Sequence, residues 1–377
     1  MNSTENELIR IIRNIVSPFA FTSDLSMDDQ EALFQLAKKH DMAHFIGYAL
    51  DKHQLSFLNQ EVKQACLQQY YQAIFRIEIL EAELSNIRTV FEDSGVDFLP
   101  LKGAVIRKLY PSKWMRVSAD IDILVHPKDL KRAEQVLSDE LNYTIADRGP
   151  YDVHVMTPNG FVVELHFRLS NHIDKAKELL DNVWSYCSLV PETFHEYQMN
   201  DEFFYFYHIF HTARHFRYGG CGVKPVLDTW ILNHRLTYNR ESRKQLLQQA
   251  SLLPFSETLE ALAEEWFSGI VTANLEDIET YIFEGGVYGG PQKVAAAQAQ
   301  SHSHFRYIMQ RAFPPINSMS YPILDKWKIL LPFCWIHRLV KGLFQGKGKK
   351  AKYELQKSKA EADRSEEFAA LFKRLGM

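Results

Sequence analysis

The sequence predicts an α+β fold, in which a mixed β-sheet with helices is flanked by helical regions at both ends of the chain. Three observations lead to this fold class. Residues 62–91 lack glycine and proline over a length typical of one long helix. Apolar runs of β-type residues at 96–101, 120–125 and 161–168 indicate strands. From about residue 171 onward, helical patterns return.

Chain length and these changes of pattern indicate how the chain is divided. Its 377 residues allow two or three domains of about 150 residues each. We expect a helical region at 1–90, an α/β core at 91–170, a helical domain at 171–345 and a basic, charged tail helix at 346–377.

Individual elements follow from local signals. Ser26, followed by Asp28 and Asp29, predicts a capped helix start, because a serine oxygen accepts from the first amides and acids favour that end. In the core we expect a strand at 96–101, a turn at Gly103, a short helix at 104–110, a strand at 120–125, a helix from Pro127 to Leu141, strands at 143–145 and 153–156, and a hairpin turn at 158–160. Helices at 201–218 and 224–236 follow, and then a flexible glycine-rich loop at 285–291.

Asp120 and Asp122 lie two positions apart in an otherwise apolar strand. Alternate residues of a strand point to the same side, so the two carboxylates project together. Like charges this close repel each other unless a cation lies between them, and Mg²⁺ typically binds one or two carboxylates plus substrate phosphates. The flanking Ile121 and Ile123 argue against the alternative, an edge strand with solvated acids.

A third acid, Glu164, lies in the apolar run at 161–168. Alternation places Glu164, His166 and Arg168 on one face of this strand. If the strand pairs beside the aspartate strand, Glu164 completes a cluster of three carboxylates, which can bind two metal ions about 3.5–4 Å apart. Alternatively, Glu164 forms a salt bridge with Arg168, or it acts as the base that takes a proton from an acceptor hydroxyl.

The ordered set of motifs resembles the nucleotidyltransferases of the polymerase-beta superfamily, and most nearly a bacterial branch of uncharacterised nucleotidyltransferases. The segments at 99–104, 120–125 and 163–166 carry the resemblance, which covers about residues 90–170. The resemblance implies a nucleotidyltransferase-type mixed sheet. It also implies transfer of a nucleoside monophosphate from an NTP to an acceptor, with a cofactor of Mg²⁺ or Mn²⁺ held by Asp120, Asp122 and Glu164.

The turn before the first core helix departs from the superfamily pattern, which usually has Gly-Ser or Gly-Gly where this chain has Gly103-Ala104. Backbone amides at a helix start can still bind phosphate, and Lys102 can replace part of the missing hydroxyl contact. Alternatively, Lys102 is a surface residue at a strand end. The resemblance implies a nucleotide-binding set of Lys102, Gly103, Ala104, Arg116 and Ser118.

His208, His211 and His215 share one face of a predicted helix, at positions i, i+3 and i+7. Their aromatic neighbours favour a packed helix with hydrogen-bonded histidines over a separate zinc site, which would need a further ligand. A weaker resemblance extends from this helix to Asp228 and implies a histidine row along the cleft. We therefore expect the cleft to be lined by His166, Arg168, His208, His211, His215 and Asp228.

Composition limits the partners of the protein. A net charge of −4, with no basic stripe before the tail, disfavours nucleic acid. Four scattered cysteines, a polar and acidic N-terminus and no apolar run near the about 20 residues of a membrane span predict a cytoplasmic protein without a transmembrane segment. We interpret 327–344 and the basic run at 347–352 as a buried helix and a solvated tail, rather than an interfacial anchor.

The hypothesis from sequence is a Mg²⁺-dependent nucleotidyltransferase with an NTP substrate. Its acceptor stays open among a small molecule, a sugar phosphate and a protein, as does its oligomeric state. The alternative is a catalytically weak nucleotide-binding or regulatory protein with the same fold, which Ala104 favours and the three acids disfavour.

Overall fold

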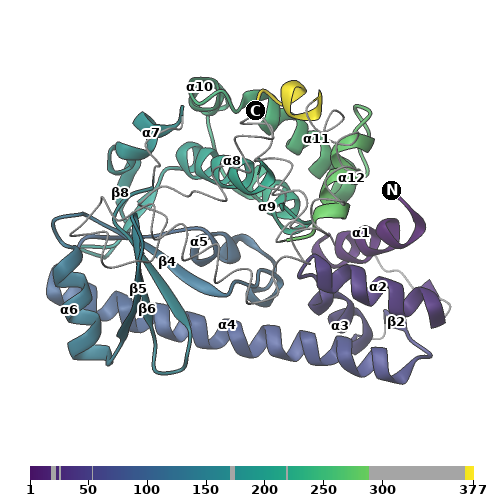
Figure 1. Ribbon diagram of the computed structural model, residues 1–377, viewed down its shortest axis with the longest axis horizontal. Helices are drawn as coiled ribbons and strands as arrows, with labels where there is room; N and C mark the ends of the chain where they lie inside the picture. The colour runs from purple at the N-terminus through teal and green to yellow at the C-terminus, as the bar shows by residue number, and fades with distance from the viewer. Residues whose placement is uncertain (18–22, 25–26, 53, 170–174, 218–219, 288–369) are drawn as a thin grey trace, which may run out of the picture.

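A computed structural model of the protein describes residues 1–17, 23–24, 27–52, 54–169, 175–217, 220–287 and 370–377. A mixed five-stranded sheet lies at one end and a helical body at the other (Figure 1). One long helix, α4 (Gln60–Ser94), runs beneath both. The predicted α+β class with a mixed sheet is confirmed.

Helix α4 spans the stretch between residues 62 and 91 that lacks glycine and proline, as predicted. It begins after Asn59, whose side chain accepts hydrogen bonds from two backbone amides of the first turn. It ends at Gly95, whose φ of 66° lies in the left-handed region that glycine adopts readily. Its side chains enter two apolar cores: Ile77 and Leu80 pack under the sheet, and Cys66 packs in the helical body.

The sheet has the strand order β3-β4-β7-β6-β5. These strands are β3 (Phe98–Pro100), β4 (Asp120–Val125), β5 (Thr144–Arg148), β6 (Asp152–Met156) and β7 (Val162–His166). β4 and β7 pair in parallel and the other neighbours pair in antiparallel fashion. The connection through α6 (Leu130–Leu141) and the β5–β6 hairpin makes this parallel pairing feasible. It sets Asp122 directly beside Glu164.

The two faces of the sheet differ in polarity. Ile121, Ile123 and Leu165 belong to the apolar core that also contains side chains of α4 and α6. The alternate residues of β4 and β7 point the other way, toward α8 (Asp201–Arg217). The predicted period-two alternation therefore puts the acids on the face opposite the core.

Some helices begin or end at other residues than predicted. The helix predicted from Pro127 begins at Leu130, because the amide of Asp129 first closes a turn onto the carbonyl of His126. The short helix α5 (Gly103–Ile106) continues as a 3₁₀ turn (Arg107–Leu109), and another such turn (Lys113–Met115) precedes β4. Ser26, residues 288–291 of the predicted loop and the segments at 327–344 and 347–352 lie outside the described residues.

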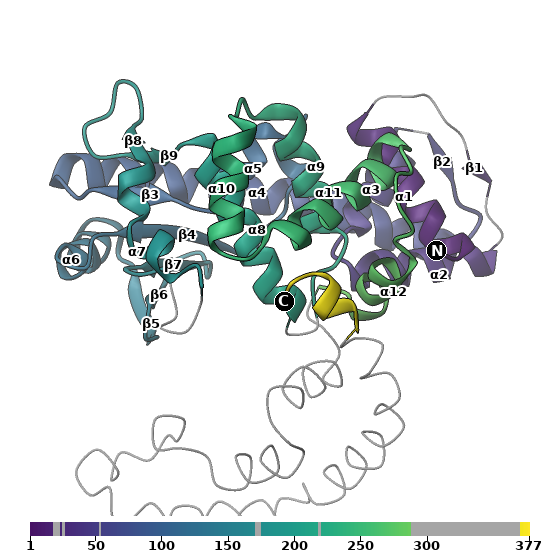
Figure 2. The ribbon, with the colours of Figure 1, turned by 90° about the horizontal axis from the view of Figure 1, so that it is seen from above.

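The two helical regions share one apolar core. The N-terminal elements are α1 (Ser3–Val16), α2 (Met27–Lys39), α3 (Ala43–Asp51) and the paired strands β1 (Ser23–Asp24) and β2 (Leu55–Ser56). The C-terminal elements are α7 (Lys177–Asp181), a 3₁₀ turn (Val183–Tyr186), the hairpin β8 (Cys187–Leu189) and β9 (Tyr197–Met199), α8, α9 (Lys224–Arg235), α10 (Arg240–Gln249), α11 (Leu253–Ser268) and α12 (Glu276–Gly285). Because α1 packs on α11, the regions join in space (Figure 2), and the predicted domain boundaries stay predictions.

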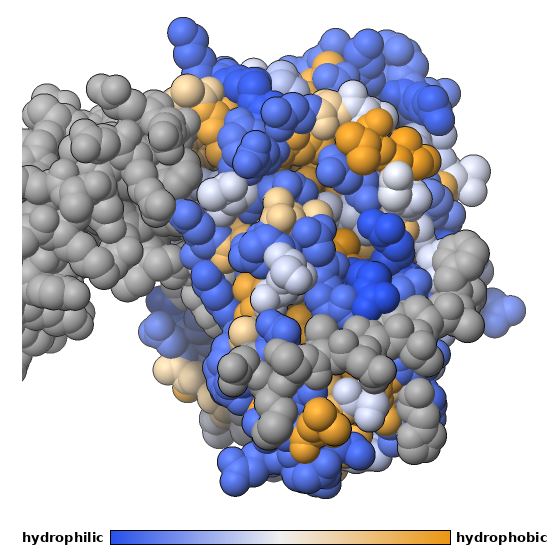
Figure 3. Space-filling model, turned by 90° about the vertical axis from the view of Figure 1, so that its right-hand side faces the viewer, coloured by the Kyte–Doolittle hydropathy of each residue, from blue (hydrophilic) through white to orange (hydrophobic). Residues whose placement is uncertain are grey.

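The surface over the N-terminal helices is mostly hydrophilic, with small hydrophobic groups between charged ones (Figure 3). This matches α1, whose inner positions are apolar and buried and whose remaining positions carry polar or charged residues. Within the described part of the chain, no helix combines the length and the apolar character that a membrane span requires.

Three buried histidines predict acid sensitivity of the fold. Burial lowers the pKa values of His40, His44 and His208 to about 4. Between pH 6.5 and 4 the unfolded chain therefore binds protons that the folded protein does not, and stability falls as the pH falls. We expect the free energy of unfolding to drop by about 2 kcal/mol per histidine between pH 7 and pH 5. Urea denaturation at both pH values measures the drop. In His208→Gln the drop should be smaller by the contribution of one histidine. An unfolding free energy that is the same at pH 7 and pH 5 would contradict the prediction.

Candidate active site

A cavity of about 510 Å³ separates the polar face of the sheet from α8. Nearly all of the predicted nucleotide-binding and acid residues line it, whereas Ala104 is buried in the apolar core of the sheet. The lining includes Lys102, Gly103, Arg116, Ser118, Asp120, Asp122, Glu164, His166, Arg168, His211 and His215. The structure thus gathers residues from 102 to 215 in one place.

Asp122 is the central acid of the cavity and is only 4% exposed. Its Oδ1 accepts hydrogen bonds from Lys102 Nζ at 2.6 Å and from His166 Nε2 at 2.9 Å. Burial alone would raise the pKa of Asp122, but the charges of Lys102 and His166 hold it well below its ordinary value. Asp122 is therefore ionised, and two cationic side chains already contact one of its oxygens.

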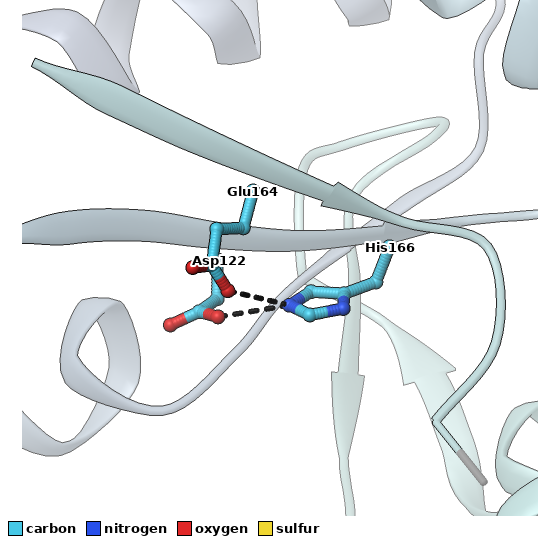
Figure 4. A group of neighbouring side chains, drawn as sticks. All are labelled: Asp122, Glu164 and His166. Carbon is cyan, nitrogen blue, oxygen red and sulfur yellow. Dashed lines mark hydrogen bonds and ion pairs between the residues drawn. The ribbon is translucent and has the colours of Figure 1, made fainter. Parts of the chain in front are cut away.

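Glu164 and His166 complete a compact group with Asp122 (Figure 4). His166 Nε2 lies 3.4 Å from Glu164 Oε2, and one ligand atom of each of the three residues lies within 4.8 Å of the others. Although burial opposes it, hydrogen bonds to the two carboxylates raise the pKa of His166 to about 9. The imidazolium thus holds a positive charge between the two carboxylates.

Asp120 stands outside this compact group. Burial raises the pKa of Asp120 to about 6, and the nearby charges of Asp122 and Glu164 act in the same direction. Of the three predicted metal ligands, the structure brings Asp122 and Glu164 together with His166, while Asp120 borders the same cavity. A second group on the neighbouring strand, Asp152 and His154, shares Glu164.

Lys102 reaches Asp122 from a strained turn. The Ala104 amide donates to the Leu101 carbonyl at 3.1 Å, which closes a turn with Lys102 at its second position. There Lys102 has φ 44° and ψ −120°, the conformation that a type II′ turn normally reserves for glycine. A non-glycine residue in such a region costs of the order of 1–3 kcal/mol and is typical of functional sites.

This strain predicts an unusual stability difference. Lys102→Gly and Lys102→Ala both remove the ammonium, but only glycine relieves the backbone. We expect Lys102→Gly to be more stable than Lys102→Ala by about 1 kcal/mol or more. At most positions the order is the opposite, because glycine loses more backbone entropy on folding than alanine does. Urea denaturation of the two variants measures the difference, and equal stabilities would show that the turn is unstrained.

The glycine and serine of the predicted nucleotide set shape the turn. A Cβ at Gly103 would lie 3.2 Å from Ser118 and 3.3 Å from the Arg107 guanidinium, so a larger residue would have to displace these two side chains by a few tenths of an ångström. Ser118 Oγ accepts from Arg107 and donates to the carbonyl of Asp120 at 3.1 Å, which fixes the start of β4. Since the Ala104 amide already bonds within the turn, Lys102 is the stronger candidate for a phosphate donor.

Arg116 and Asp228 form a buried ion pair. Arg116 Nε lies 2.7 and 2.9 Å from the two Asp228 oxygens, and the Tyr110 hydroxyl donates to Asp228 at 2.7 Å. Asp228 was expected to line the cleft with the histidine row, and it lines one cavity together with His208, His211 and His215. Its ion-pair partner is Arg116, while His208 Nε2 lies 2.9 Å from the hydroxyl of Thr229.

The histidine row borders a second cavity of about 380 Å³ that adjoins the first. His208, His211 and His215 all line it, and His211 and His215 lie 3.3 Å apart through their Nε2 atoms. Burial holds the pKa of His211 well below its ordinary value, so its ring is neutral. The row therefore presents neutral imidazoles opposite the acids.

Several residues of the site were missed from sequence. Tyr207, Arg214 and Lys224 line the larger cavity, and so does Asp152. For Asp152 and His154 the period-two alternation in β6 was an available signal, since it is the one that revealed Glu164. For Arg214, which follows His211 by three positions on α8, helical spacing was an available signal. Lys224 lies on α9, and its place in the cavity depends on how that helix packs.

Comparisons with known proteins identify the family to which the chain is similar. Residues 26–268 match the model of a family described as uncharacterised nucleotidyltransferase. No match was found among curated proteins. The solution structure of the antibiotic-resistance factor ANT(2'')-Ia is similar at 10% sequence identity, covering 54% of this chain and 99% of that one. Its TM-score of 0.29 is too low for any inference about this chain.

Proposed function

Since the chain belongs to the uncharacterised nucleotidyltransferase family, we propose that it transfers a nucleoside monophosphate from an NTP to an acceptor and releases pyrophosphate. The observation that carries the proposal is the cavity in which Asp122 and Glu164 lie side by side on paired strands, with Lys102 bound to Asp122. Family membership supports the nucleotidyl transfer role, and the site residues and the metal are our proposal.

The donor set fits a divalent cation. Two carboxylates and an imidazole offer ligand atoms within 4.8 Å of one another, and Asp122 Oδ1 already accepts from two cationic donors. We assign Asp120, Asp122 and Glu164 as the residues that would hold Mg²⁺ or Mn²⁺. When bound, such ions neutralise the triphosphate and lower the pKa of the acceptor hydroxyl.

The protein's own charges favour an NTP in the larger cavity. Lys102, Arg168, Arg214 and Lys224 line the same cavity as the acids, and a triphosphate would meet them. In the reaction, the acceptor oxygen bonds to the α-phosphorus while the bond to the bridging oxygen of the β-phosphate breaks. The hydroxyl proton passes to a base of the acid cluster, for which Glu164 is the candidate.

The test is thermal shift and pyrophosphate release with each of the four NTPs and Mg²⁺ or Mn²⁺, comparing wild type with Asp122→Asn. A metal-dependent shift that only wild type shows would support the proposal, and turnover would establish the enzyme. Binding without turnover in a broad acceptor screen would favour the nucleotide-binding protein. No shift with any NTP, or an equal shift in the variant, would refute the site.

A further inference from the structure

His166 lies where a metal ligand would lie. It follows Glu164 by two positions on β7, so both side chains project from one face of the strand into the cavity. Its Nε2 faces both carboxylates, at 2.9 Å from Asp122 and 3.4 Å from Glu164 (Figure 4). The His166 side chain is only 11% exposed, so its position is set by packing as well as by charge.

These separations suit ligands of one ion. Two neighbouring ligand atoms of an octahedral ion, each at about 2.1 Å from the metal, stand about 3 Å apart. The two measured separations, 2.9 and 3.4 Å, are close to that spacing. Asp120, by contrast, has no oxygen in this compact group.

We propose that His166 is a metal ligand, and that Asp122, Glu164 and His166 together bind a first-row transition ion such as Mn²⁺ in preference to Mg²⁺. The inference rests on the proposed function, because this ion is one of those that serve the NTP. Mg²⁺ is a hard cation that prefers oxygen, whereas an imidazole nitrogen binds first-row transition ions more readily; Mn²⁺ is the weakest binder of that series but still accepts nitrogen more readily than Mg²⁺ does. The ion replaces the proton on Nε2, as metal binding to histidine requires.

A rival arrangement uses the neighbouring strand. His154 Nε2 lies 3.7 Å from Asp152 and 3.9 Å from Glu164, so this second group also offers two acids and one imidazole. Its members are more exposed, with 39% for the His154 side chain against 11% for His166. Water competes more strongly for an ion there, so the buried group is the better site.

The test measures Mn²⁺ binding to the full-length protein, with and without α,β-methylene-ATP, by calorimetry and by pulsed electron paramagnetic resonance. A directly bound imidazole gives a ¹⁴N modulation in the Mn²⁺ spin echo. We expect this modulation in wild type, its loss in His166→Gln, and its retention in the matched control His154→Gln. Mn²⁺ should bind at least about tenfold more tightly than Mg²⁺, and His166→Gln should reduce Mn²⁺ affinity at least about tenfold.

The outcomes separate the two proposals. Mn²⁺ binding that Asp122→Asn abolishes but that lacks nitrogen modulation would overturn the His166 assignment and leave the proposed function intact. Loss of modulation only in His154→Gln would move the ion to the second group and also overturn it. No Mn²⁺ binding in either state would overturn the His166 proposal, and absence of Mg²⁺ binding as well would overturn the proposed function. If His166→Gln fails to fold, the wild-type modulation together with its retention in His154→Gln still supports His166, and its absence in wild type still overturns the proposal.

Discussion

Asp120→Asn is expected to abolish nucleotidyl transfer and at the same time to stabilise the metal-free protein. The loss of a carboxylate that holds the ions should cost about 4 kcal/mol of transition-state stabilisation, a thousandfold in rate. The gain in stability follows from repulsion, because burial and the charges of Asp122 and Glu164 raise the pKa of Asp120 to about 6. Removing one negative charge relieves that repulsion.

The stability gain has a defined pH dependence. Because the folded pKa of Asp120 lies above the unfolded value, protonation stabilises the fold at low pH, and this stabilisation is lost as the pH rises through about 6. Asp120 is half-buried, so solvent screening reduces the full effect to about 1 kcal/mol at pH 8. The difference in unfolding free energy between Asp120→Asn and wild type should become smaller as the pH falls toward 5.

Urea denaturation at pH 8 and pH 5, together with pyrophosphate release, tests both halves of this prediction. The exposed Asp139 on α6 provides a control, since Asp139→Asn should change neither stability nor transfer. A variant that is less stable than wild type at pH 8, or that retains transfer, would remove Asp120 from the metal site. A substitution that raises stability and removes activity is typical of an active-site residue whose position is unfavourable for the fold but required for function.

Alternation along strands predicted which faces of β4 and β7 are polar, and the structure agrees for Asp122 and Glu164 because a strand has only two faces. Their mutual position was only a conditional prediction. The pairing of two strands depends on the α6 crossover and on the intervening hairpin, which local sequence does not specify. The proximity of His166 to Asp122 depends on this pairing as well.

Partners distant in sequence could not be predicted. Asp228 lines a cavity with the histidine row, as expected, but its ion-pair partner is Arg116, 112 positions earlier in the sequence, which nothing in the sequence indicated. Which of several cations meets a buried acid depends on how α9 packs against the turns before β4. The strain at Lys102 was equally hidden, since lysine is not a residue that predicts positive φ.

Asp228→Asn is expected to destabilise the fold by about 3–5 kcal/mol, because it leaves the Arg116 guanidinium buried without a counter-charge. The Arg116 side chain is 14% exposed and that of Asp228 is 2% exposed, so the pair is largely removed from bulk solvent. Lys224 adds to the cost, since its charge and that of Arg116 repel each other.

The double variant Arg116→Met/Asp228→Leu distinguishes a structural pair from a catalytic acid. Removing both charges leaves none uncompensated, so we expect it to recover most of the stability lost in Asp228→Asn. Urea denaturation of both variants measures this recovery, and pyrophosphate release measures transfer beside it. If Asp228 instead acted on the nucleotide, Asp228→Asn would abolish transfer with little change in unfolding free energy. The expected outcome is the reverse, because both oxygens of Asp228 are engaged by Arg116 and one of them also by Tyr110.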